Sequence, residues 1–275
     1  MQIEFWHAKS PSSYMGKGNH RRDNLEELSL SRLMNTEILY SFLHRNPNLK
    51  SLSLNNCYFE NILPLKEDTE IENLGVVPNL KSLMLIDLLN LKEISFEPAI
   101  ILERLEFLIL KNCCNMITIA PSSVSFTRLK NLEVVKCDRL QSLMSASTAK
   151  SLVQLNTMKV VKCESLMEIV RKDGQKSDRV VFQQLKALEL VSLKNLKSFC
   201  VSDCDFEFPS LEKLVVSACY NMDKFSETVT SSPILQNVHV VHGKENKRFC
   251  WEGDINATIQ KMFEEMVCNY VCFLD

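Results

Sequence analysis

The chain has 275 residues, of which 45% are hydrophobic, and its formal net charge at pH 7 is −2. This composition allows a long apolar core and gives no overall positive charge that would favour a nucleic-acid partner. The first residues lack the order of a secretory signal, and no apolar run approaches the roughly 20 residues that span a bilayer. We therefore expect a cytoplasmic protein with no membrane span.

Residues 1–24 differ from the rest of the chain. They are polar and turn-prone, with Ser10-Pro-Ser-Ser and Gly16-Lys-Gly as their clearest segments. Such a composition favours a loose N-terminal lead-in, and we assign it no fold.

From residue 25 onward the chain repeats itself. The pattern L-x-x-[LMV]-x-[LV] recurs at intervals of 24 to 31 residues up to His242, and its copies begin at Leu25, Leu49, Leu80, Leu105, Leu129, Leu155, Leu185, Leu211 and Leu235. Apolar residues at offsets 3 and 5 alternate as on a strand, and the pattern then continues in steps of three, which suit 3₁₀-like turns. We predict an α/β leucine-rich-repeat solenoid, a curved horseshoe of about nine repeats with a parallel concave β-sheet and short convex helices or 3₁₀ turns.

Three segments between the strands have their own character. Asn35 can cap a short helix whose apolar face is formed by Ile38, Leu39, Phe42 and Leu43 and which ends before Pro47. Charged residues fill the two longest intervals, at 66–72 and 171–179, and we expect both to bulge outward as solvated loops.

Cysteine usage follows the repeat. Of eleven cysteines, five occupy offset 8, namely Cys57, Cys113, Cys137, Cys163 and Cys219, and leucine fills this position in three other copies, at Leu33, Leu88 and Leu193. A small, mostly apolar side chain suits a buried place where the strand turns. Stacked neighbours would have parallel Cα–Cβ vectors, which oppose disulfide geometry. We predict free thiols in a reducing compartment.

The C-terminal segment predicts a helix that closes the solenoid. Asp254 or Asn256 can cap it, and its apolar positions are Ile259, Met262, Phe263, Met266, Val267 and Tyr270. Asn256-Ala-Thr matches a glycosylation acceptor, but a capping role for Asn256 is favoured without a signal peptide. The expected organisation is a lead-in at 1–24, a repeat domain at 25–250 and a capping helix at 251–275.

The block LKNLEVVKCDRLQSL from Leu129 resembles the irregular C-terminal repeats of plant coiled-coil nucleotide-binding leucine-rich-repeat disease-resistance proteins. Pro-Asn-Leu-Lys-Ser-Leu at 47–52 and 78–83, Phe-Pro-Ser-Leu-Glu-Lys-Leu at 208–214 and the tail from Trp251 are similar too. In full-length members a P-loop switch precedes the repeats, whereas Gly16-Lys-Gly lacks its spacing. The resemblance implies an immune receptor module that senses pathogen effectors or restrains a nucleotide switch. Its implied protein partners are an effector, a host guardee or the nucleotide-binding domain of the same receptor.

Strand alternation predicts the concave face residue by residue, because offsets 2, 4 and 6 point away from the buried leucines. From the third repeat onward these positions are markedly apolar, and contiguous exposed apolar area tends to mark interaction surfaces. Preference of strands for β-branched residues is the alternative explanation. The candidate protein-binding face comprises Met84, Ile86, Phe107, Ile109, Lys111, Glu133, Val135, Lys136, Lys159, Val161, Lys162, Glu189, Val191, Val215 and His239.

Four lysines of this set, Lys111, Lys136, Lys159 and Lys162, fall near the strand ends of three successive repeats. They could steer an acidic partner. Lysines beside glutamates usually only solvate a face, and this second interpretation is favoured from sequence.

Motifs for metal binding or catalysis are weak. Cys200-x-x-x-Cys204, Cys268-x-x-x-Cys272 and His239-x-x-His242 lack the paired short spacings of a zinc module, and no nucleophile and base can be paired by spacing. We expect no cofactor, no metal and no catalytic residue. The leading hypothesis is a non-catalytic protein-recognition module of plant innate immunity. The alternative is a substrate-receptor subunit of a ubiquitin ligase, whose repeats also carry cysteines.

Overall fold

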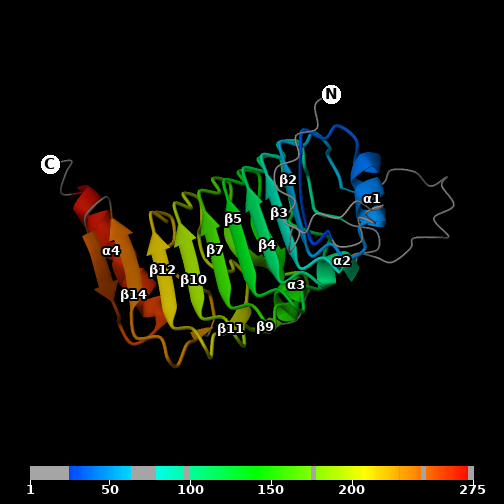
Figure 1. Ribbon diagram of the computed structural model, residues 1–275. Helices are drawn as coiled ribbons and strands as arrows, with labels where there is room; N and C mark the ends of the chain where they lie inside the picture. The colour runs from blue at the N-terminus through cyan, green and yellow to red at the C-terminus, as the bar shows by residue number, and fades with distance from the viewer. Residues whose placement is uncertain are drawn as a thin grey trace, which may run out of the picture.

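The computed structural model describes residues 25–62, 79–95, 100–174, 178–228, 230–242 and 246–271. Its main feature is a curved ten-stranded sheet in which successive strands lie side by side in chain order (Figure 1). The strands that pair in parallel are β1 (Glu27–Ser31), β2 (Ser51–Asn55), β3 (Ser82–Ile86), β4 (Phe107–Lys111), β5 (Asn131–Val135), β7 (Thr157–Val161), β10 (Ala187–Val191), β12 (Lys213–Ser217) and β14 (Val238–His242). The predicted parallel-sheet solenoid is therefore confirmed.

Strand register follows the leucine anchors. Each of the first eight strands begins two residues after its anchor leucine, and equivalent offsets pair across the sheet, as in Leu52 with Leu83 and Leu132 with Met158. Offsets 3 and 5 are buried in all of these strands, while the alternate positions remain at least partly exposed except Ser217. Variation in repeat length is therefore absorbed outside the strands, and the predicted facing of the side chains is confirmed.

The turn out of each strand has a feature that the repeat pattern did not predict. The residue at offset 7 adopts a left-handed backbone in eight repeats, with φ between 51° and 57°, although none of the eight is glycine: Arg32, Asn56, Asp87, Asn112, Lys136, Lys162, Ser192 and Ala218. In each of the first seven, the backbone N–H donates to the offset-6 carbonyl of the following strand, at 2.7 to 3.0 Å. These bonds fix the turn and offset the cost of the left-handed conformation.

The convex side contains short strands as well as helices. Helices α1 (Thr36–Arg45), α2 (Ile100–Glu103) and α3 (Ala146–Ser151) occupy three of the returns. Two small parallel sheets, which the sequence analysis did not predict, lie in the returns of the later repeats. One is formed by β6 (Ser142–Ser145) and β8 (Glu168–Arg171), and the other by β9 (Asp178–Val181), β11 (Cys204–Glu207) and β13 (Thr230–Ser231).

Two predictions for the returns can be compared with these elements. Asn35 caps α1 as predicted, because its side chain accepts the Glu37 N–H at 2.7 Å, and Leu39 and Leu43 are buried. The loop predicted at 171–179 is wrong in part, since its two ends belong to β8 and β9, and residues 175–177 lie outside the described residues. The lead-in at 1–24 and the insertion at 66–72 lie outside them too. The number of nine complete repeats stays a prediction. A repeat includes its return, and residues 63–78 and 96–99 of two returns are not described.

The core between the concave sheet and the convex returns is continuous. It includes the offset-8 residues, which are buried as predicted, and their thiols donate to backbone carbonyls, as Cys163 does to Val161 at 3.6 Å. Behind the later repeats the predicted core phenylalanines Phe182, Phe199, Phe208 and Phe225 contact one another and Phe206, with ring centroids 4.9 to 6.2 Å apart. These rings fill the space that smaller aliphatic side chains fill elsewhere.

The C-terminal end is closed by β15 (Asn246–Cys250) and α4 (Ile255–Val271). β15 runs antiparallel to β14, which the repeat pattern did not predict. Asp254 caps α4 by accepting the Ala257 N–H at 2.8 Å, and Ile255, Ile259 and Met262 are buried. The structure does not describe the side chains of Met266, Val267 and Tyr270.

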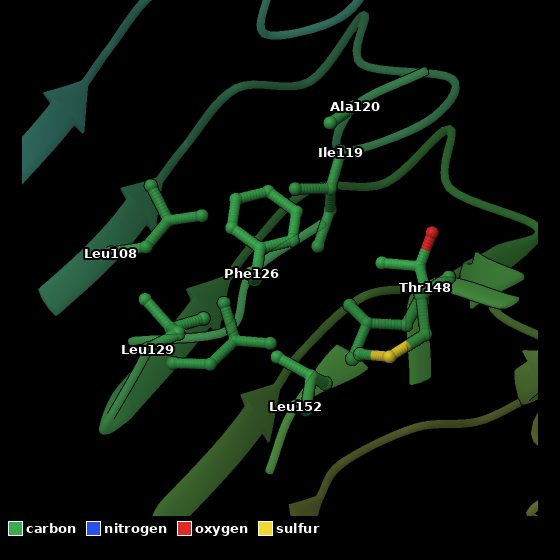
Figure 2. A pocket seen from close by; sticks show the side chains of 10 residues that line it. Leu108, Ile119, Ala120, Phe126, Leu129, Thr148 and Leu152 are labelled. Carbon is green, nitrogen blue, oxygen red and sulfur yellow. The ribbon is translucent and has the colours of Figure 1, made fainter. Parts of the chain in front are cut away.

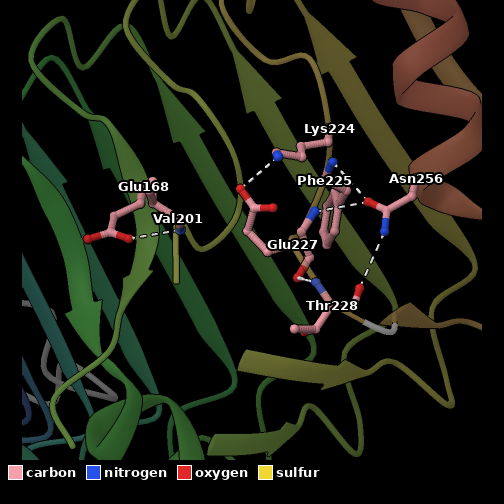
Figure 3. Close-up of polar contacts among 8 residues, drawn as sticks. Glu168, Val201, Lys224, Phe225, Glu227, Thr228 and Asn256 are labelled. Carbon is pink, nitrogen blue, oxygen red and sulfur yellow. Dashed lines mark hydrogen bonds and ion pairs between the residues drawn. The ribbon is translucent and has the colours of Figure 1, made fainter. Parts of the chain in front are cut away.

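Asn256 does not cap α4, and the favoured assignment for it is wrong. Its Oδ1 accepts the backbone N–H groups of Phe225 at 3.0 Å and Ser226 at 2.9 Å, and its Nδ2 donates to the Thr228 carbonyl at 3.4 Å (Figure 3). One amide side chain therefore ties the terminal helix to the last convex return.

Candidate protein-binding face

The concave face is built from side chains that stack in columns across the sheet. Because the strands pair in phase, Met84 lies opposite Ile109, Ile109 opposite Glu133, and Glu133 opposite Lys159. A second column joins Val135, Val161 and Val191 on β5, β7 and β10. Neighbouring members of a column are about 4.8 Å apart, which is the strand spacing of a sheet.

The predicted apolar residues are accessible. Phe107 is 41% exposed, and Met84, Ile86, Ile109, Val135, Val161, Val191 and Val215 are all partly exposed. Their strand neighbours at offsets 3 and 5 are buried within the solenoid. The structure thus places these side chains together on one open surface. Their role in binding stays a prediction.

Charged side chains on the face are largely paired with one another. Glu133 lies 3.3 Å from Lys111 and 3.9 Å from Lys159, measured from carboxylate oxygen to Nζ, and Glu189 lies 2.6 Å from Lys213. Lys213 was missed in the sequence analysis, although its offset 2 places it on this face. Exposed ion pairs of this kind contribute about 0 to 1 kcal/mol each to the stability of the fold. Their main effect is to orient charged side chains on the face.

Three predicted residues lie at the margins of the concave face. Lys136 and Lys162 are exposed and belong to the left-handed turns just past β5 and β7, so they border the face and do not stand on a strand. His239 is partly exposed on β14 at the C-terminal end.

A row of charges also follows the rim where the strands begin. Glu106 lies between Lys130 at 2.8 Å and Lys81 at 2.9 Å. Hydrogen bonds from Lys130 and then Lys81 hold the pKa of the Glu106 carboxyl below its ordinary value. Lys50 with Glu26 and Lys186 with Glu212 repeat the arrangement, so opposite charges bridge adjacent repeats along this rim.

An apolar cavity in the core offers no ligand site. It has a volume of about 20 Å³ and is lined by residues that include Leu108, Phe126, Leu129, Thr148 and Leu152 (Figure 2). Small-molecule sites have volumes of several hundred Å³ and present convergent polar groups. The cavity is a packing defect between the sheet and a convex return.

The described residues contain no cluster of three or more His, Cys, Asp or Glu side chains that could hold a metal ion. Nine described cysteines are free thiols, Cys200 and Cys204 among them, and both of these are buried. Burial raises the pKa of Cys163 and of Cys219 to about 11, so both thiols are protonated at neutral pH. The structure does not describe the side chains of His242 and Cys268, and Cys272 lies outside the described residues.

A curved parallel sheet with in-phase leucines and a structured convex side defines a leucine-rich-repeat protein. The family of plant disease resistance protein RPS2-like leucine-rich repeats matches residues 102–164 and 122–242, and the chain belongs to this family. No curated protein and no solved structure matches the chain. In the part of the chain described, none of the helices is both long and apolar enough to cross a bilayer.

Proposed function

We propose that the chain is a non-catalytic protein-recognition module of plant immunity whose concave face binds the partner. The observation that carries this proposal is the exposure of the column Val135, Val161 and Val191 together with Met84 and Ile109 on one sheet face. Burial of these valine side chains by a partner would stabilise the complex by roughly 25 cal/mol per Å² of apolar area removed from water. A surface with this composition favours protein contacts over catalysis, since both of its glutamates are paired with lysines of the same face.

The family gives this surface a biological setting. A resistance-protein repeat domain suits sensing of a pathogen effector or of a host protein that the effector modifies. Restraint of a nucleotide-binding switch domain through the same face is the other role we propose, with the chain acting as the C-terminal part of a cytoplasmic coiled-coil receptor. Family membership supports these roles by analogy, and the geometry supports recognition of a protein.

Substitution on the concave face tests the proposal. The tagged chain and the double variant Ile109→Glu with Val161→Glu are each used to capture proteins from leaf extract, and the captured proteins are quantified by mass spectrometry. The matched control carries Val201→Glu with Ile234→Glu, which also adds two charges at exposed apolar residues, 45% and 48% exposed, that lie outside the concave strands. Circular dichroism checks that all three fold alike.

We expect the original chain and the control to capture the same proteins. The concave variant should capture at least about 10-fold less of them, because two buried unpaired carboxylates would cost several kcal/mol at an interface. Equal capture by all three proteins would contradict the proposal. Recovery of a ubiquitin-ligase adaptor as the main captured protein would favour the ligase alternative.

A further inference from the structure

The concave face from β4 to β12 is basic, although the whole chain has a net charge of −2. Across the exposed strand positions and the offset-7 turns, the acidic residues are Glu133 and Glu189, and the basic residues are Lys111, Lys136, Lys159, Lys162 and Lys213. A local excess of positive charge on a slightly acidic chain favours an acidic partner at that place.

The five lysines fall into two groups. Lys111, Lys159 and Lys213 are paired with the two glutamates of the face. Lys136 and Lys162 are exposed and have no ion pair within the described residues. Two of the four lysines considered in the sequence analysis, Lys136 and Lys162, are therefore available to pair with an acidic partner.

Geometry holds the two unpaired lysines next to each other. Their backbone N–H groups donate to Val161 and Val191 at 2.9 Å, which fixes equivalent left-handed turns in adjacent repeats. The side chains thus leave the backbone about 4.8 Å apart, immediately beyond Val135 and Val161. Two positive side chains that start side by side on one rim favour an anionic group bound between them.

The two acidic residues that follow these lysines on the rim form no ion pair with them. Asp138 follows Lys136 by two residues, and its Oδ1 accepts the Glu164 N–H at 3.3 Å. Glu164 follows Lys162 in the same way, and its carboxylate is paired with Lys194 at 2.9 Å. Both carboxylates are thus held in contacts along the rim.

The valine column beside these lysines indicates the shape of the partner. Val135, Val161 and Val191 span two strand spacings, or about 10 Å. Two turns of an α-helix rise about 11 Å, so apolar side chains at i, i+3 or i+4, and i+7 match the column. An extended strand places alternate side chains almost 7 Å apart, so three of them span about 13 Å and do not match the spacing of the valine column.

We propose that the concave face binds an acidic amphipathic helix of a partner protein, laid across β5, β7 and β10. Its apolar stripe covers the valine column, and carboxylates on one flank pair with Lys136 and Lys162. This inference rests on the proposed function and adds the chemical class of the partner.

Three stapled helical peptides of 18 residues test the proposal. They share a leucine stripe at i, i+4, i+7 and i+11 and differ only at the flanking positions, which are all Glu, all Gln or all Lys. Stapling keeps the helix formed in each, because isolated peptides of this length are marginal helices. Fluorescence anisotropy gives the Kd for the original chain, for Lys136→Gln with Lys162→Gln, and for Lys172→Gln with Lys197→Gln, which removes the same charge outside the concave strands.

We expect the Glu peptide to bind the original chain about 5-fold more tightly than the Gln peptide, the effect of two exposed ion pairs, and the Lys peptide to bind most weakly. The Lys136 and Lys162 variant should lose this preference and bind the Gln peptide as before, while the control variant keeps the preference. Three results would each overturn the proposal of an acidic helical partner. They are equal affinity for the three peptides, a preference for the Glu peptide that survives in the Lys136 and Lys162 variant, and no binding of any peptide. Binding of the Gln peptide that is lost with Val161→Glu would still support recognition by the apolar face, so the two proposals fail separately.

Discussion

The backbone N–H of Lys136 donates to the carbonyl oxygen of Val161 at 2.9 Å, one strand further along the solenoid. The same bond joins Asn112 to Val135 and Lys162 to Val191. Each bond ties a left-handed residue to the end of the next concave strand, so the hydrogen bonding of the sheet continues into this rim. Side chains at offset 7 consequently have fixed starting points beside the concave face.

Substitution of Ser192 tests the left-handed turns. Ser192 has a φ of 56°, and a β-branched residue is strained there while glycine is not. We expect Ser192→Val to lower the free energy of unfolding by about 1 to 3 kcal/mol and Ser192→Gly to change it by less than about 1 kcal/mol. Urea denaturation followed by circular dichroism measures both, and equal effects of the two variants would argue against a left-handed residue here.

Two residues on opposite faces of β5 test the register of the sheet. Leu132 is 2% exposed, whereas Val135 is partly exposed on the concave face. We expect Leu132→Ala to cost about 2 to 5 kcal/mol of stability, because it leaves a cavity, and Val135→Ala to cost less than about 1 kcal/mol. Urea midpoints give the comparison, and a larger loss for Val135→Ala would place the strand in the opposite register.

Asn256 tests how the C-terminal helix is attached. Asn256→Ala leaves two backbone N–H groups, those of Phe225 and Ser226, without their acceptor, which costs about 1 to 3 kcal/mol when such groups are partly buried. We expect faster hydrogen exchange across α4 in this variant. Asn256→Asp keeps an acceptor for both groups and should retain most of the protection; similar exchange in the two variants would show that these bonds do not hold the helix.

Buried thiols predict a loss of stability in alkali. Burial raises the pKa of Cys163 from 9.0 to about 11 in the folded chain. The folded state therefore binds a proton that the unfolded state releases between these values, and stability falls as the pH rises from about 9 to 11, by an order of 2 kcal/mol for this thiol. Cys163→Ala should weaken the pH dependence of the urea midpoint across this window, and an unchanged slope would contradict the burial of the thiol.

Much of the fold follows from short-range sequence patterns. Leucines at offsets 0, 3 and 5 set both the period and the inward face, so the strand positions and the accessibility of Val135 and Val161 follow from the sequence. Asn35 and Asp254 were identifiable as caps because a cap acts on residues two or three positions away. Cysteine at offset 8 was recognisable as a core residue because it alternates with leucine there.

The remaining features depend on contacts between repeats. Parallel pairing of β9 with β11 joins segments about 26 residues apart, and neither segment shows a strong alternation of its own. Asn256 bonds to a return about 30 residues earlier, so its spacing alone suggested a cap. Pairing of Lys111 and Lys159 with Glu133, which leaves Lys136 and Lys162 exposed, depends on the direction of each side chain at the end of its strand.

Site-specific photo-crosslinking tests directly whether the concave face binds protein. A benzophenone amino acid is placed at Val161 on the concave face or at Val201 outside the concave strands, and the two chains are irradiated with the same leaf extract. We expect a discrete crosslinked protein from position 161 that is absent from position 201 and is lost when Ile109→Glu is added. Crosslinks of equal yield from both positions, or from Val201 alone, would contradict it.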